Sequence, residues 1–321
     1  MPWGLVVAYT YNIGDDMQSL AACQYLPQIN CIVDRDFPKV RHCKGQVKAI
    51  FNGWYTYNWW SWIPSNNIEP LFTSFHLAPH IAGLFLSNQK TREYLMKHAP
   101  IGARDHATLI ILRNHGIKAY FSGCLTLTLD YTFSKLKGVL KRDYILVALD
   151  TQIMLDAIIR KLKSYLDIVT VNPNHYFPIR FIKVPPVLIK VLKALNNMAV
   201  ADSVVYLFER PRAKTIPINL KLKRALIVLT IIANARLTIT SRLHVALPAI
   251  AFNVPALFIH PNLHDPRFSG LLDFVNAFSP HKFLNEVLEK PMSEALWDIP
   301  NYETLCELKK RLIYVVKEFV R

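Results

Sequence analysis

The chain has 321 residues, 52% of them hydrophobic and 19% charged, which supports two domains with buried cores and excludes a disordered or low-complexity chain. Lys and Arg outnumber Asp and Glu by 38 to 23, a formal net charge of +15. The basic residues are dispersed and carry no zinc-finger, RNP-type or basic-zipper signature, so nucleic acid is not an expected partner. An anionic substrate accounts better for the charge, and peripheral contact with an anionic membrane stays open.

The cysteines and the first residues predict a cytoplasmic protein. Five cysteines, an odd number with no C-x-x-C pair, argue against a disulfide framework and against a zinc site. Residues 1–9 are apolar without a basic leader, which predicts a buried strand rather than a signal peptide. The longest apolar segment, residues 225–235, is too short for a bilayer, which needs roughly 20 apolar residues.

Nearly continuous apolar runs predict buried parallel strands in a first domain over residues 1–140. The expected strands there are residues 4–9, 31–33, 47–51 and 117–121, with a helix over 108–115. After a basic linker over 135–142 the strand pattern restarts, which predicts a second domain over 141–300. Its expected strands are 144–149, 167–171, 203–208, 237–240 and 255–259, and its expected helices are 154–166 and 188–199.

The expected fold class is therefore α/β, with two Rossmann-like domains that face a central cleft. In such sheets ligands bind where the strands end at their carboxyl edge. Residues 301–321 form a third segment, in which apolar residues at helical spacing predict an amphipathic helix that docks on another surface.

The first segment with chemical character follows the first strand and reads Tyr11-Asn-Ile-Gly-Asp-Asp. Gly14 permits a sharp turn, and the helix after it offers free N–H groups to an anion. Asp15 or Asp16 is placed to accept a proton from a sugar hydroxyl. The alternative is that one of them only caps the helix.

Two further segments lie at strand ends of the first domain. Arg104 precedes the helix over 108–115, where its guanidinium suits a carboxylate or phosphate; a surface pair with Asp105 is the alternative. Ser122 and Gly123 end the next strand and allow a ligand to approach the backbone. Cys124 beside them is expected to be a small buried hydrophobic residue rather than a nucleophile.

The second domain carries Thr240-Ser-Arg-Leu-His between a strand and a helix. Arg242 at a helix N-terminus suits a phosphate, and His244 is able to move protons at physiological pH, unless it is simply hydrogen-bonded into the core. The later loop carries His264, Asp265 and Arg267, but its spacing matches no common zinc pattern, so no metal is expected.

The ordered set of short motifs resembles the polysaccharide pyruvyl transferase family from about Val6 to Asp273. The motifs are Asn12-Ile-Gly-Asp-Asp, Asn52-Gly-Trp, Ser74-Phe-His-Leu, Ile101-Gly-Ala-Arg-Asp, Phe121-Ser-Gly-Cys-Leu-Thr, Thr240-Ser-Arg-Leu-His and Asp265-Pro-Arg-Phe-Ser-Gly-Leu. The resemblance implies a GT-B-like fold whose C-terminal helix crosses back onto the first domain. It also implies transfer of pyruvate from phosphoenolpyruvate to a sugar of a glycan, with formation of a ketal, release of phosphate and no further cofactor.

Site roles follow from the resemblance. It implies donor binding by Arg242, Leu243 and Arg104, to which we add Gly14, Ser122, Gly123 and Arg267. His244 is the expected acid, Asp15 or Asp16 the expected base, and Trp54 and His76 the expected acceptor contacts. The alternatives are a GT-B glycosyltransferase that uses a nucleotide sugar, and a non-catalytic glycan-binding relative. The acceptor sugar, the role of residues 210–223 and the oligomeric state stay undetermined.

Overall fold

The protein is described here by a computed structural model, which covers residues 1–41, 43–55, 60, 62–140, 144–150, 158, 167–171, 179–181, 217–288 and 297–321. The strand expected over 203–208 and the helix expected over 188–199 lie outside the described residues, as does the helix over 154–166 apart from Ile158.

The first domain is built on a sheet whose strands, within the described residues, follow the order β3-β2-β1-β4-β5-β6-β7. Every neighbouring pair is parallel except β2 and β3. The strands are β1 (Trp3–Val7), β2 (Cys31–Asp34), β3 (Val40–Arg41), β4 (Val47–Trp54), β5 (Ile68–His76), β6 (Ile101–Ala103) and β7 (Ala119–Phe121). The helices are α1 (Ile13–Cys23), α2 (Pro79–Ser87), α3 (Gln89–Lys97) and α4 (His106–Asn114), followed by η1 (Leu125–Thr128), α5 (Asp130–Phe133) and η2 (Ser134–Leu136).

The second domain repeats this plan. Its described strands follow the order β10-β9-β8-β11-β12-β13, again with an antiparallel pair, β9 and β10, at the edge. They are β8 (Tyr144–Ala148), β9 (Asp167–Val171), β10 (Ile179–Phe181), β11 (Leu237–Thr240), β12 (Ala256–Ile259) and β13 (Asn276–Phe278). The helical segments are α9 (Ile218–Ala233), α10 (Leu243–Ala251), η4 (Pro266–Phe268), η5 (Leu272–Phe274), α11 (Pro280–Lys282), η6 (Phe283–Val287) and α12 (Tyr302–Val320). The α/β prediction, two Rossmann-like domains with parallel sheets, is confirmed.

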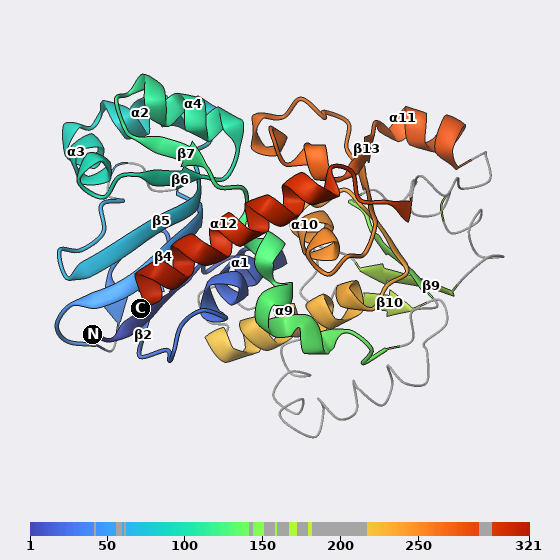
Figure 1. The fold of residues 1–321 in the computed structure, drawn as a ribbon, viewed down its shortest axis with the longest axis horizontal. Helices are drawn as coiled ribbons and strands as arrows, with labels where there is room; N and C mark the ends of the chain where they lie inside the picture. The colour runs from blue at the N-terminus through green and yellow to red at the C-terminus, as the bar shows by residue number, and fades with distance from the viewer. Residues whose placement is uncertain are drawn as a thin grey trace.

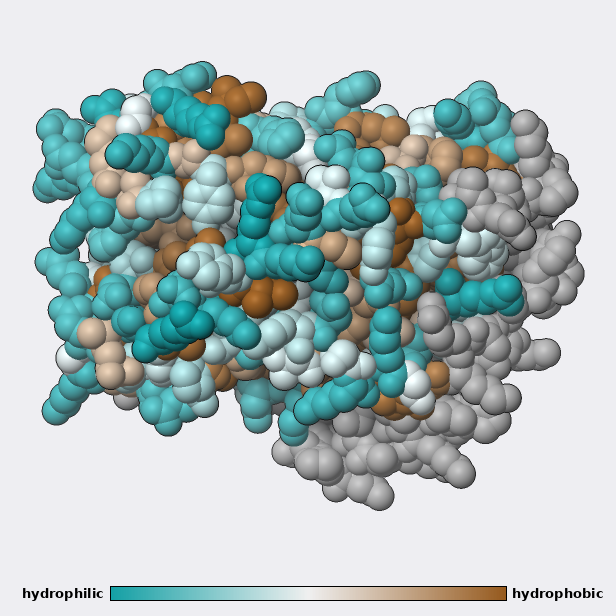
Figure 2. All heavy atoms as spheres, viewed as in Figure 1, coloured by the Kyte–Doolittle hydropathy of each residue, from teal (hydrophilic) through white to brown (hydrophobic). Residues whose placement is uncertain are grey.

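Helix α12 crosses the face of the molecule from the side of β13 toward β4, so it touches both domains (Figure 1). Leu308 packs on Gly123, where an added Cβ would lie 2.8 Å from Leu308 Cδ2. Near the end of α12, the ring of Phe319 meets Trp3 at 6.1 Å, and its carbonyl accepts a hydrogen bond from Lys48 Nζ at 3.2 Å. The outward face of α12 is largely polar, and hydrophobic side chains on this face of the molecule are scattered in small groups (Figure 2).

One hydrophobic cluster runs through both domains. It contains Val7 of β1, Leu146 of β8, Phe258 of β12 and Leu308 of α12. The apolar stretch over 225–235 contributes to the same cluster as the buried part of α9, as its length indicated. Among the described residues, no helix combines the length and the apolar composition that crossing a membrane requires.

The prediction against disulfides was wrong in one respect. Cys31 and Cys43 form a disulfide, with Cα atoms 5.7 Å apart. The antiparallel pairing of β2 with β3 brings the two cysteines together, since Ile32 lies opposite Arg41. An odd number of cysteines excludes a fully paired framework, but it does not exclude a single bridge within a short hairpin-like connection.

Candidate active site

A pocket of about 230 Å³ lies between the two domains. The first domain contributes residues 12–15 and Gln18 after β1, Trp54 at the end of β4 and Arg104 after β6. The second contributes Asp150 after β8, residues 241–245 after β11, His260 after β12, and Arg267 with Phe268. All these positions follow the carboxyl ends of strands, around the points where the strand order of each sheet reverses, which is where doubly wound sheets bind ligands.

The turn after β1 brings α1 against the other domain. Asn12 caps α1, because its side-chain oxygen accepts a hydrogen bond from the Gly14 N–H at 3.0 Å. A Cβ on Gly14 would lie 2.8 Å from His244 Nδ1, so only glycine fits at this position without displacing the imidazole. The capping role that was the alternative for one of the aspartates therefore belongs to Asn12, and both aspartates lie in the first turn of α1.

Asp15 and Asp16 point to different surroundings. Asp15 lines the pocket, forms an ion pair with the buried Arg35 at 2.9 Å and accepts a hydrogen bond from the Thr10 hydroxyl. Asp16 is held between the domains by Lys221 at 3.0 Å and Arg224 at 2.7 Å, both on α9. Asp15 is the aspartate of this pair that a ligand in the pocket meets.

Arg104 is a buried cation with little compensation from the protein. Its side chain is 3% exposed and its Nε lies 3.4 Å from Asp105, too long for a strong hydrogen bond. That Nε has no hydrogen-bond partner within the described structure. Because a buried charge is costly unless it is paired, an anion in the pocket is the natural partner of this guanidinium.

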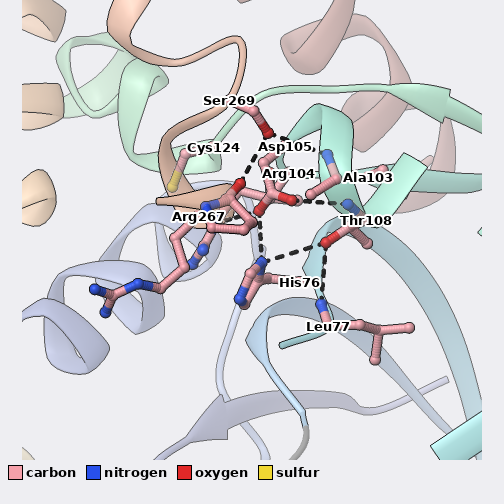
Figure 3. Close-up of polar contacts among 12 residues, drawn as sticks. His76, Leu77, Ala103, Arg104, Asp105, Thr108, Cys124, Arg267 and Ser269 are labelled. Carbon is pink, nitrogen blue, oxygen red and sulfur yellow. Dashed lines mark hydrogen bonds and ion pairs between the residues drawn. The ribbon is translucent and has the colours of Figure 1, made fainter. Parts of the chain in front are cut away.

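The carboxylate of Asp105 is committed elsewhere. It contacts His76 Nδ1 and caps α4 by accepting the Thr108 N–H at 2.9 Å (Figure 3). Burial, together with the nearby charge of Arg104, lowers the pKa of His76 to about 4, so the neutral imidazole donates its Nδ1–H to an ionised Asp105. His76 Nε2 is buried without a hydrogen-bond partner in this part of the structure.

His244 enters the pocket from the first turn of α10. Its Nε2 lies 3.1 Å from the Gln18 side-chain amide and 3.8 Å from the sulfur of Cys124. Burial, followed by the charge of Arg104, lowers the pKa of His244 to about 3, so the ring is neutral at physiological pH when no ligand is bound. Burial also raises the pKa of the Cys124 thiol, which fits its expected role as a small buried residue.

Two arginines of the second domain reach the pocket as members of ion pairs. Arg242 binds Asp150 through Nε at 2.8 Å and Nη2 at 2.5 Å, and Arg267 binds Asp265 through Nη2 at 2.7 Å. Their side chains are 33% and 39% exposed. Arg242 is also the residue that precedes α10, so the free N–H groups of that helix face the same pocket.

A family model described as polysaccharide pyruvyl transferase matches residues 12–262, which carry most of this pocket. The chain belongs to the polysaccharide pyruvyl transferase family. Membership makes it a glycan-modifying transferase and agrees with the resemblance of its motifs. None of the curated proteins is significantly similar to it in sequence.

Two solved structures similar to this transferase are UDP-N-acetylglucosamine 2-epimerases. A UDP-GlcNAc 2-epimerase from Methanocaldococcus jannaschii, in complex with UDP-GlcNAc and UDP, is 14% identical with a TM-score of 0.43. The match covers 98% of this chain and 100% of that one. A second UDP-N-acetylglucosamine 2-epimerase is 12% identical with a TM-score of 0.45, over 97% and 95% of the two chains. Likenesses this distant carry no conclusion about the ligand of the transferase.

Not every residue expected at the site reaches the pocket of the transferase. Gly14, Asp15, Trp54, Arg104, Arg242, Leu243, His244 and Arg267 line it. Ser122 instead fastens β5 to β6, by accepting from the Ser74 N–H and donating to the Ala103 carbonyl. Gly123 receives Leu308 of α12, and Asp16 lies at the domain interface. His76 is fully buried beneath Trp54, whose ring meets it edge-on at 5.4 Å, so it supports Trp54 rather than touching a ligand.

Several pocket residues were not predicted. Gln18 lies one helical turn after Gly14, so its place on the same face of α1 was readable from the spacing. Asp150 and His260 directly follow predicted strands, a signal that points to the cleft but not to a role. Among the described residues, no group of three His, Cys, Asp or Glu side chains is arranged to hold a metal ion.

Proposed function

We propose that this protein transfers the pyruvyl group of phosphoenolpyruvate to a sugar of a glycan or polysaccharide precursor, forming a ketal and releasing phosphate. The observation that carries the proposal is Arg104, a buried guanidinium that lines the pocket with its nearest carboxylate 3.4 Å away. Phosphoenolpyruvate is a small donor with two anionic groups, and a pocket of about 230 Å³ suits it.

The arginines of the pocket come from both domains, so the carboxylate and the phosphate of such a donor can each contact a guanidinium. Arg104 comes from the first domain, while Arg242 and Arg267 come from the second. Arg242 lies at the N-terminus of α10, where the helix dipole and the free N–H groups favour a phosphate. We assign the phosphate to this helix end and the carboxylate to Arg104.

The reaction requires a proton at the methylene carbon of the donor, which makes C2 cationic. The oxygen of a sugar hydroxyl then bonds to C2 and loses its proton to Asp15, which lines the pocket and forms an ion pair with Arg35. The bond from C2 to the phosphate oxygen breaks, and phosphate leaves on the cations that hold it. The oxygen of the second sugar hydroxyl then bonds to C2, which closes the ketal, and its proton returns to the neutral imidazole that the first proton transfer leaves behind.

His244 is the group we assign to the first proton transfer. Without a ligand it is neutral, because burial and Arg104 lower its pKa to about 3. A bound donor brings negative charge next to the imidazole and neutralises the guanidinium, and both changes raise its pKa. The donor therefore prepares its own acid.

The acceptor enters beside Trp54, which lines the pocket and rests on the buried His76. A flat aromatic ring suits the apolar face of a pyranose. We place the reaction in the cytoplasm, where phosphoenolpyruvate is a metabolite. Contact with an anionic membrane stays a proposal drawn from the charge of +15.

The test is phosphate release from phosphoenolpyruvate in the presence of a panel of galactosides, mannosides and N-acetylhexosaminides. We expect release that depends on an acceptor and is lost in His244→Ala, while His244→Ala still binds the donor. His115→Ala is the matched control, because His115 binds the Ile111 carbonyl outside the pocket. Thermal stabilisation by UDP, with none by phosphoenolpyruvate, would overturn the proposal in favour of a nucleotide-sugar enzyme.

A further inference from the structure

The N-terminus of α4 is completed by the other domain. A helix begins with N–H groups that have no partner within the helix. Asp105 accepts one of them, from Thr108. The two N–H groups before it, those of His106 and Ala107, donate to the carbonyl and to the hydroxyl of Ser269, each at 3.1 Å. Ser269 follows η4 of the second domain, so this cap reaches across the cleft (Figure 3).

The contact is closely fitted. Gly270 has a φ of +79°, which favours glycine, and a Cβ added there would lie 2.9 Å from the His106 ring. The Ser269 hydroxyl is itself oriented, because it donates to the Pro266 carbonyl at 2.8 Å. The segment from Asp265 to Gly270 is thus closely fitted to the N-terminus of α4, and a residue larger than glycine at position 270 would disturb this contact.

The contact joins the backbone segments that carry two pocket cations. Arg104 stands two residues before His106, and Arg267 stands two residues before Ser269. Both guanidiniums line the pocket, and both act on the pKa of His76 and His244. Each guanidinium has a carboxylate neighbour, Asp105 at 3.4 Å from Arg104 and Asp265 at 2.7 Å from Arg267, which reduces the repulsion between the two positive charges without removing it.

We propose that Ser269 is a positioning residue, which caps α4 across the cleft and thereby holds Arg267 and Arg104 on the same donor anion. The proposal deepens the proposed function and rests on it for the identity of the donor. Since the anion neutralises the repulsion, donor binding and the cap favour each other. By linkage, the factor by which the donor strengthens the cap is also the factor by which the cap strengthens donor binding, so removing the cap weakens donor binding.

The experiment compares Ser269→Ala with Ser279→Ala by calorimetric titration of phosphoenolpyruvate and, separately, of inorganic phosphate. Ser279 is the matched control, since it caps α11 of the same domain by accepting the Lys282 N–H, away from the pocket. We expect Ser269→Ala to weaken phosphoenolpyruvate binding roughly fivefold, as the loss of one helix cap implies, and to raise KM with little change in kcat. Ser269→Thr keeps the hydroxyl and restores affinity.

A second pair of variants tests the fit itself. Gly270→Ala places a methyl group against His106 and should weaken the donor more than Ser269→Ala does. Adding His106→Ala removes the ring and should recover part of that loss, which a purely local strain at position 270 would not allow. Equal affinities in Ser269→Ala and Ser279→Ala, or no recovery in the double variant, would overturn the positioning role.

The two proposals fail in different ways. If the wild-type protein binds inorganic phosphate but not phosphoenolpyruvate, the proposed function is wrong, and the phosphate titrations still decide the role of Ser269. If it binds phosphoenolpyruvate and Ser269→Ala binds it equally well, the proposed function stands and the positioning role is wrong. If it binds neither anion, both proposals are wrong.

Discussion

The two walls of the pocket come from sheets with the same strand order, but they hold their cations differently. In the first domain Arg104 is 3% exposed, and its only carboxylate neighbour among the described contacts is 3.4 Å away. In the second domain Arg242 and Arg267 are 33% and 39% exposed, and each binds a carboxylate closely. The repeated fold therefore sets the positions of the loops, while the residues in each loop determine how well its arginine is paired by a carboxylate of the protein. The first wall presents a buried charge with a carboxylate neighbour at 3.4 Å, and the second presents partly exposed charges in close ion pairs.

Acid should lower the free energy of unfolding through both walls of the pocket, because each wall buries a neutral histidine. Burial, with Arg104 nearby, lowers the pKa of His76 to about 4 and of His244 to about 3, from 6.5 in the unfolded chain. At pH values between the folded and the unfolded pKa of each histidine, the unfolded chain binds more protons than the folded chain. The free energy of unfolding is therefore highest above pH 6.5 and falls as the pH drops. Each histidine should remove roughly 3 kcal/mol of unfolding free energy by pH 4.

Urea unfolding at a series of pH values checks this dependence. His244→Gln removes one titrating ring and keeps an amide side chain, so it should flatten the slope by about half. His281→Gln, at an exposed position on α11, should leave the slope as it is. An unchanged slope in His244→Gln would show that this imidazole is not held neutral by the fold.

Replacing Arg104 tests the wall whose charge is buried and weakly paired. Arg104→Ala should weaken phosphoenolpyruvate binding about a hundredfold, since charged hydrogen bonds in a desolvated site contribute most. Arg104→Lys keeps the charge without the fork and should lose roughly tenfold. Arg113→Ala is the control, because Arg113 binds the Ala119 carbonyl instead of lining the pocket. Titration calorimetry measures all three, and a change below twofold in Arg104→Ala would contradict the comparison.

The smallest loss should come from the wall whose charges are partly exposed and closely paired. Arg242→Ala and Arg267→Ala should each weaken the donor about fivefold to tenfold, because both guanidiniums already have carboxylate partners and are partly exposed. Their contribution should shrink at high salt, whereas that of Arg104 should persist. Repeating the titrations at low and high salt measures the difference. A larger loss of donor affinity in Arg242→Ala than in Arg104→Ala would show that the second wall contributes more to donor binding than the first.

Strands with continuous apolar runs were predictable. The expected strands over 167–171 and 237–240 coincide with β9 and β11, and those at β1, β8 and β12 differ only at their ends. Strand β5 was missed, because it mixes Glu69, Pro70 and Ser74 with its apolar residues. Its backbone is tied to a distant residue, as in the bond from the Ser74 N–H to the Ser122 hydroxyl, and such pairing has no local signature in the sequence.

The site was predictable to the level of loops but not of side-chain direction. Adjacent residues diverge: Asp15 faces the pocket while Asp16 faces α9, and Arg104 faces the pocket while Asp105 turns to His76 and Thr108. The direction of Asp16 depends on Arg224, which lies 208 residues further along the chain. The disulfide between Cys31 and Cys43 was missed for the same reason, since it depends on the pairing of β2 with β3.

The hydrophobic cluster shared by Val7, Leu146 and Leu308 also bears on the modularity of the chain. Two sheets with one strand order suggest a duplicated module that works in isolation. Here the halves share their interior and are strapped together by α12, so neither is a self-sufficient unit. A fragment of residues 1–140 would expose the apolar side chains that the second half covers. Although the architecture is a repeat, the two halves are expected to fold together.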